Sequence, residues 1–152
     1  MACATNRVSA AVVAGLLLAA SATVEAKQRP KTLAREEIPQ DFSIGSAEPV
    51  LGLKVSVVDG RVASAAPADA KDANVRATRS GGEGQTTLTV RTDLAVAVKF
   101  DLYVSGDGRR FEYASTCAVT PGVSSFEMWE KPVREFALGN PRVVAANAVT
   151  CD

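Results

Sequence analysis

The sequence predicts an all-β fold, an antiparallel β-sandwich of about seven strands, with a small β-barrel as the alternative. Apolar residues recur at every second position in several segments, which is the period of a half-buried strand. Turn-forming residues interrupt the chain about every 8–12 residues, the spacing expected of sandwiches and barrels. No segment of useful length has the period of a helix, so no competing fold class is indicated.

The first 26 residues have the layout of a secretory signal peptide. A short segment ending at Arg7 precedes an uncharged apolar run over residues 8–20, and small-residue cleavage patterns end at Ala22 and Ala26. A retained membrane anchor is the alternative, but the uncharged window after Arg7 has only 17 residues, at the low edge of a membrane span. We therefore expect a secreted or periplasmic protein with no stable membrane insertion after cleavage.

Residues 27–47 are expected to form an extended N-terminal arm ahead of a β-sandwich domain at 48–152. Charged residues and prolines interrupt this segment, and no apolar period runs through it. Phe42 and Ile44 are the residues that would anchor it.

The sandwich domain is expected to begin with a hairpin. Apolar residues alternate over Leu51–Val58, Asp59-Gly60 is a strong signal for a two-residue turn, and residues 61–63 would start the return strand. Residues 64–85 are rich in alanine and aspartate and give the weakest signal. A short helix over 67–75 and a long mobile loop both suit this stretch, so we expect a flexible insertion there.

The strongest strand signal follows this insertion. Threonines alternate with apolar residues from Thr86, and residues 94–104 carry an apolar side chain at every second position. Residues 105–108 would make a tight loop, and Phe111 and Tyr113 would begin the partner strand. This hairpin is the most secure element that the sequence predicts.

The last third of the chain is expected to add further strands. Pro121-Gly122 marks a turn, residues 124–129 alternate as a strand, and residues 133–138 are a further candidate. Gly139–Pro141 would turn the chain once more, and residues 142–151 would form the closing strand. This rhythm is immunoglobulin-like in the general architectural sense, without the signature of a family.

Cys117 and Cys151 are expected to form one disulfide. Cys3 would leave with the signal peptide, so an oxidising compartment allows a single pairing. Strand parity places both thiols on positions that face one core. The alternative is a pair of buried free thiols.

The composition excludes several kinds of site. The chain has no histidine, which rules out Ser-His-Asp catalysis and His-ligated zinc. Its 17 basic and 17 acidic residues balance, which argues against nucleic acid as a partner. Asp101 and Asp107 were natural candidates for calcium, but the loop after Ser105 lacks alternating acidic ligands. We expect no metal and no cofactor.

Two groups of residues would suit hydrolytic chemistry. A serine activated by lysine would use Ser124 or Ser125 with Lys131, although no motif spacing supports this pair. A glycosidase needs two carboxylates that flank one bond. The acidic residues that lie close together in sequence are Glu127, Glu130 and Glu135. A solvated strand face is the simpler interpretation of these charges.

A binding cluster is the more interesting candidate. Its residue types are those that dominate binding hot spots, namely Trp129, Tyr103, Arg134 and Lys131. An outward Trp129 would recognise a sugar, a peptide or a partner protein. The competing interpretation is that Trp129 packs into the core. It is the favoured one, because tryptophan side chains are usually mostly buried.

The sequence therefore predicts an exported binding or structural module rather than an enzyme. Its partner would be an envelope or extracellular protein, a polysaccharide, or a second copy joined through a strand edge. A small secreted hydrolase that uses carboxylates is one alternative. A small-molecule carrier, if the strands enclose a cavity, is another. The sequence leaves the oligomeric state open.

Overall fold

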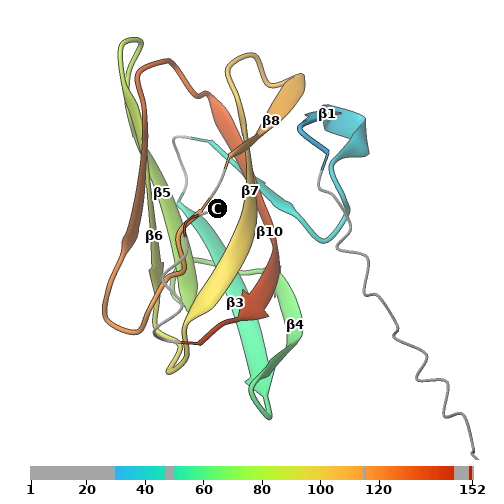
Figure 1. Cartoon of the computed structure of the whole chain (residues 1–152), viewed down its shortest axis with the longest axis vertical. Helices are drawn as coiled ribbons and strands as arrows, with labels where there is room; N and C mark the ends of the chain where they lie inside the picture. The colour runs from blue at the N-terminus through green and yellow to red at the C-terminus, as the bar shows by residue number, and fades with distance from the viewer. Residues whose placement is uncertain (1–29, 47–49, 115, 146–150, 152) are drawn as a thin grey trace, which may run out of the picture.

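The computed structural model describes residues 30–46, 50–114, 116–145 and 151, and arranges them as two stacked antiparallel sheets (Figure 1). The sheets do not close into a barrel, so the predicted β-sandwich is confirmed. The described residues contain ten strands rather than about seven. The predicted signal peptide lies outside them.

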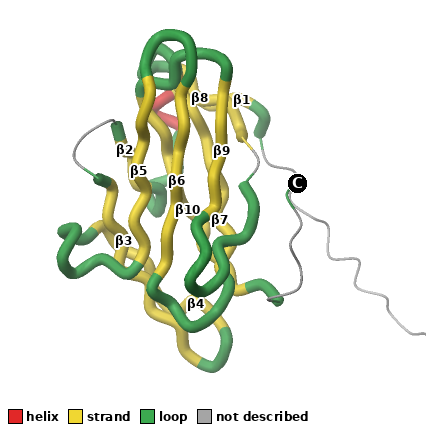
Figure 2. Tube along the Cα trace, turned by 90° about the vertical axis from the view of Figure 1, so that its left-hand side faces the viewer, coloured by secondary structure: helices red, strands yellow, loops and turns green. Residues whose placement is uncertain are grey.

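Each sheet has five strands, and we call them sheet A and sheet B. In spatial order, sheet A consists of β1 (Thr32–Ala34), β8 (Arg110–Ala114), β7 (Val98–Ser105), β10 (Glu135–Val143) and β2 (Ser43–Gly45). Sheet B consists of β4 (Arg61–Pro67), β3 (Leu51–Val58), β5 (Val75–Gly81), β6 (Thr86–Thr92) and β9 (Ser125–Trp129). Figure 2 looks onto sheet B, with sheet A behind it.

The main hydrophobic core lies between the two sheets. Alternate residues of each strand face inward, and burying one large aliphatic or aromatic side chain contributes about 1.5–3 kcal/mol. The largest fully buried side chains of this cluster are Phe100, Leu102, Phe136 and Leu138 from sheet A and Val55, Val75, Leu88 and Val90 from sheet B. The apolar alternation in the sequence therefore marks the inner faces of both sheets.

The predicted hairpin at the start of the domain forms as expected. Asp59 and Gly60 both have positive φ, at 49° and 72°, and join β3 to β4. Two residues of this conformation match the twist of the flanking strands, and aspartate and glycine adopt it at low cost. The local sequence alone is sufficient to place this turn.

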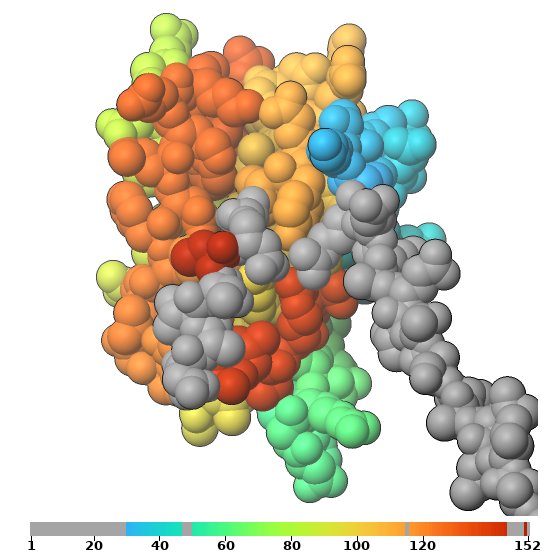
Figure 3. Space-filling view, viewed as in Figure 1, coloured from blue at the N-terminus to red at the C-terminus, as the bar shows by residue number. Residues whose placement is uncertain are grey.

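The outer face of sheet A is covered by the chain's own N-terminal segment. β1 and β2 form opposite edges of the sheet, and residues 35–42, which we call the strap, connect them. Phe42 of the strap meets Tyr103 edge-on, with ring centroids 5.8 Å apart. It also lies over Gly139, where an added Cβ would come within 2.4 Å of the Phe42 ring. In Figure 3 the blue atoms of this segment lie against the gold atoms of the β7–β8 hairpin.

The predicted extended arm is thus more ordered than the sequence indicates. It contributes two three-residue strands and the 3₁₀ helix Arg35–Glu37. Phe42 packs as an anchor, but Ile44 is exposed and is held by backbone pairing with Ala137. These strands exist because open sheet edges offer them hydrogen-bond partners, a tertiary effect that local sequence does not encode.

The predictions for residues 64–85 are wrong. Neither a helix over 67–75 nor a long loop forms, because β4 continues to Pro67 and β5 occupies Val75–Gly81. β5 lies between β3 and β6 at the centre of sheet B, and its Val75 and Ala77 are buried. Burial between neighbouring strands determines the structure here, although small residues give a weak strand signal.

The predicted turn at Gly139–Pro141 is also wrong. β10 runs through it from Glu135 to Val143, with a register shift against β7 between Gly139 and Arg142. Asn140 has a φ of 48°, so the extra residues are accommodated as a β-bulge. Gly-Asn-Pro therefore bends one strand instead of separating two, and half of the predicted closing strand, residues 146–150, falls outside the described residues.

The predicted disulfide is confirmed, since Cys117 and Cys151 are bonded. The prediction that both thiols project from strands is wrong, because neither residue belongs to a strand. β8 ends at Ala114, so its parity does not extend to Cys117. Cys117 lies in the crossing from sheet A to sheet B, and the bond attaches the C-terminal end of the chain to that crossing.

Candidate functional site

The structure places Trp129 and Tyr103 on different layers. Trp129 is the last residue of β9 and packs against the core between the sheets. Tyr103 is buried on the opposite face of sheet A, in a small cluster with Phe111 and Ala137 beneath the strap. The two aromatic residues therefore do not form one recognition surface.

Lys131 and Arg134 are both exposed but have different surroundings. The Lys131 Nζ lies 2.9 Å from Glu112 Oε2, and this contact lowers the pKa of Glu112. Exposed ion pairs of this kind contribute at most about 1 kcal/mol. Arg134 donates its backbone N–H to the Ser105 carbonyl at 2.8 Å. The four predicted binding residues are thus not brought together.

Lys131 also lines a groove of about 370 Å³ beside β8. Its lining residues are Val104, Gly106, Asp107, Arg110, Glu112, Lys131, Pro132 and Val133. Three of its four charged groups have partners, since Glu112 pairs with Lys131 and Asp107 accepts backbone N–H groups of its own loop. We therefore regard the groove as a structural feature of the β7–β8 hairpin.

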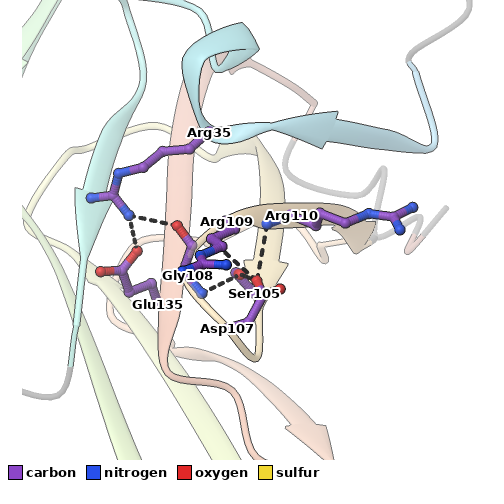
Figure 4. A network of polar contacts seen from close by, with 7 residues as sticks. All are labelled: Arg35, Ser105, Asp107, Gly108, Arg109, Arg110 and Glu135. Carbon is purple, nitrogen blue, oxygen red and sulfur yellow. Dashed lines mark hydrogen bonds and ion pairs between the residues drawn. The ribbon is translucent and has the colours of Figure 1, made fainter.

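Asp107 organises the loop at one end of this groove (Figure 4). Its Oδ1 accepts the backbone N–H groups of Arg110 at 3.0 Å and Arg109 at 2.8 Å. The Ser105 hydroxyl donates to the same oxygen at 3.1 Å. These hydrogen bonds, with that of Arg110 the largest, lower the pKa of Asp107 to about 2. The carboxylate stabilises the loop and offers no calcium-like arrangement with Asp101.

The same loop receives Arg35 from the strap (Figure 4). One guanidinium nitrogen donates to the Gly108 carbonyl at 2.9 Å and pairs with the Glu135 carboxylate. The contact joins the strap to the β7–β8 loop and to β10, and it occupies one of the three carboxylates considered for hydrolysis.

The other two carboxylates have separate environments. Glu127 points inward from β9, and its Oε1 accepts the Cys117 N–H at 3.1 Å. Burial raises the pKa of Glu127, and the Cys117 hydrogen bond partly opposes this. Glu130 is exposed beyond the end of the strand. Glu127, Glu130 and Glu135 share no contact in the described part of the chain, and nothing in their arrangement favours a glycosidase.

The proposed serine–lysine pair does not meet either. Ser125 Oγ is buried and has no hydrogen-bond partner among the described residues, whereas Lys131 pairs with Glu112. Ser124 lies just before β9. An unpartnered buried hydroxyl is an energetic cost rather than an activated nucleophile.

Asp101 has a structural environment as well. It is 4% exposed, and its carboxylate accepts hydrogen bonds from Arg142 at 2.9 Å and Asn140 at 2.8 Å. Burial of a paired, fully hydrogen-bonded carboxylate is tolerated in proteins. Within residues 30–46, 50–114, 116–145 and 151, no group of three or more potential ligands is arranged to hold a metal ion.

The surface that sequence reasoning missed is the outer side of β9. Ser125, Glu127 and Trp129 face inward, so Phe126 and Met128 face solvent and are 60% and 56% exposed. β9 is an edge strand of sheet B, and within the described parts of the chain only β6 pairs with it. The period of two separates the two faces of a strand but does not say which face is inward.

The outer face of sheet B continues from this edge in two rows. Across β9, β6 and β5, the first row is Met128, Thr87 and Ser80, and the second is Phe126, Thr89 and Thr78. Beyond these rows, Arg91 lies opposite Arg76 on β6 and β5. The face therefore has an apolar edge, hydroxyl groups in the middle and two cationic side chains at one end.

Comparison with known proteins adds no further assignment. No protein-family model, curated protein or solved structure matches this chain. Among the described residues, no helix has the length and apolar character needed to cross a bilayer. The outer face of sheet B, with the edge at β9, is the candidate functional site that the geometry favours.

Proposed function

We propose that this chain is an exported, non-enzymatic recognition module that binds a partner protein along strand β9. The observation that carries the proposal is the outward orientation of Phe126 and Met128 on an edge strand. Large apolar side chains that gather on an exposed surface indicate an interaction site, whereas single exposed apolar residues are normal.

The chemistry of the edge supports a peptide chain as partner. The outer side of an edge strand presents backbone N–H and C=O groups, and an added strand satisfies them while its side chains contact the exposed apolar residues. A polysaccharide lacks the series of peptide N–H and C=O groups that such pairing needs. Val123, just before β9, is a further exposed apolar residue.

The outward face of the edge strand carries no charge and no proline. Edge strands in soluble proteins are often blunted by lysine or proline, and β9 contains neither. Its one charged residue, Glu127, points inward and accepts the Cys117 N–H, so the outward residues Phe126 and Met128 are both apolar. An outward face of this kind is suited to contact with the side chains of a partner strand.

Site-specific photo-crosslinking in the protein's own host tests this proposal. A photoreactive residue replacing Phe126 is expected to give one discrete protein adduct, which the added substitution Met128→Asp reduces strongly. The matched control places the same photoreactive residue at Val58, an apolar residue 55% exposed on the hairpin at the far side of sheet B.

Val58 is expected to give no discrete adduct. Equal adduct patterns from positions 126 and 58, or no adduct from position 126, would contradict a partner site on β9. If the protein crosslinked at position 126 is a second copy of this chain, the site on β9 stands and the partner is another molecule of the same protein.

A further inference from the structure

A second feature of sheet B is a hollow of about 380 Å³ on its outer face, away from the edge at β9. β5 and β6 run side by side through the middle of this face (Figure 2). The residues that line the hollow are Val50, Ala70, Arg76, Thr78, Thr89 and Arg91. Two of the six are cationic and none is acidic.

The two arginines occupy directly opposite positions on β5 and β6. Like charges placed opposite each other across a sheet are destabilising. Arg76 is held by the Ala70 carbonyl at 3.0 Å and by Asp93 at 2.7 Å. Arg91 is exposed and has no hydrogen-bond or ion-pair partner in the described part of the chain, so one positive charge stays uncompensated.

The neighbouring row adds hydroxyl groups. Thr78 and Thr89 pair across the same two strands, one row from the arginines, and neither side-chain hydroxyl has a partner among residues 50–114 and 116–145. The charged residues of the adjacent loop, Asp69, Lys71 and Asp72, do not line the hollow. The hollow therefore offers the hydroxyl groups of Thr78 and Thr89, the guanidinium of Arg76 held in place, and the guanidinium of Arg91, which has no partner among the described residues.

We propose that this hollow binds an oxyanionic group, the carboxylate, sulfate or phosphate of a small ligand. The guanidinium of Arg91 would donate hydrogen bonds to two oxygens of such a group. Charge-assisted hydrogen bonds of this geometry are stronger than hydrogen bonds between neutral groups. Arg76, fixed by Ala70 and Asp93, supplies a second cation in place. The anion would also relieve the repulsion between the opposite arginines.

The proposal is independent of the partner site on β9. It rests on β5 and β6, and none of its residues belongs to the edge strand. Met128→Ser is a neutral change in the row of Thr87 and Ser80, which do not line the hollow, and should therefore leave oxyanion binding unchanged. Either proposal can thus fail without the other.

Titration of the purified disulfide-bonded protein with sulfate, phosphate and citrate tests the proposal, with chloride at matched ionic strength as the background. Saturable binding is expected for at least one oxyanion and is followed by shifts of the backbone amide signals of Thr78 and Thr89. Sulfate and phosphate together indicate a tetrahedral group, and citrate alone indicates a carboxylate.

Arg91→Gln is expected to weaken binding about tenfold or more, the effect of losing charge-assisted hydrogen bonds. The control Arg61→Gln removes the same charge from an exposed position on β4, outside the hollow, and should leave binding unchanged. Thr89→Val removes one hydroxyl with little change of volume and should weaken binding severalfold. Equal binding by the Arg91 and Arg61 variants, or no saturable binding by any oxyanion, would overturn the proposal.

Discussion

Glu127 shows how a single residue of β9 couples the edge strand to the disulfide. Its side chain is half-buried on the inner face, where it accepts the Cys117 N–H. Burial favours the uncharged carboxyl and raises its pKa from 4.5. The folded state therefore holds a proton at pH values where the unfolded chain has released it.

Glu127→Gln is expected to raise stability at neutral pH and to have little effect near pH 4. The folded carboxyl has the higher pKa, so the free energy of unfolding falls as the pH rises through the range between the two pKa values. Glutamine keeps an acceptor for Cys117 and removes this loss. Thermal melting between pH 4 and pH 8 measures the effect.

Glu130→Gln is the matched control, because Glu130 is exposed three residues further along the chain. A Glu127→Gln advantage that does not grow with pH, or that Glu130→Gln reproduces, would show that burial of Glu127 is not the cause.

At the scale of single residues, the sequence predicted which side chains share a face but not which face is inward. Alternation over residues 124–129 puts Glu127 and Trp129 on one face and Phe126 and Met128 on the other, which is how β9 arranges them. The direction was decided by packing of Trp129 against the core between the sheets, which alternation alone does not specify. That is why the exposure of Phe126 and Met128 could not be predicted from the sequence.

Among the elements, the strap is the one that most affects sheet A. It runs from β1 at one edge to β2 at the other and covers Tyr103 and Phe111. Arg35 fastens its first residues to the β7–β8 loop and to Glu135. The strap thus covers β7 at Tyr103, and β7 is buried along its whole length.

Phe42→Ala is expected to destabilise the fold by about 2–3 kcal/mol, less than a fully buried phenylalanine would. The substitution removes the ring that packs on Tyr103 and over Gly139. Urea denaturation followed by far-ultraviolet circular dichroism measures the loss.

Phe126→Ala makes the same change at an exposed site and should stay within about 0.5 kcal/mol of wild type. If both variants unfold at the same urea concentration as wild type, the strap does not contribute to the stability of sheet A.

The predictability of the elements followed the strength of their local signals. The β3–β4 and β7–β8 hairpins were predicted because aspartate and glycine at the turns and alternation in the strands agree. β5 was missed because alanine and arginine carry little strand preference, and its burial between β3 and β6 is a tertiary effect. β1 and β2, which flank the strap, were missed because the open edges of sheet A, and not the local sequence, give them hydrogen-bond partners.

For the molecule as a whole, the disulfide closes the end of the fold. It links residues 34 positions apart and attaches the end of the chain to the crossing between the two sheets. The pairing was predictable because a predicted signal peptide would remove Cys3 and leave two cysteines, and the position of the bond outside the strands was not.

Cys117→Ser is expected to lower the free energy of unfolding by roughly 3–4 kcal/mol on the chain-entropy account. Cys151→Ser and the double variant should lose the same amount, since each removes the same cross-link. Thermal unfolding of the three variants checks this. Reaction of the wild-type thiols with an alkylating reagent before reduction would contradict the pairing.

The central claim is that an exported β-sandwich recognises a partner protein through β9, and native mass spectrometry of the protein recovered from its own compartment tests it most directly. We expect a chain lacking its first 22 or 26 residues, two daltons lighter than its reduced form, in an assembly that the Phe126→Asp, Met128→Asp double variant loses. A bare monomer in both the wild type and the variant, or an assembly that the double variant retains, would contradict the claim.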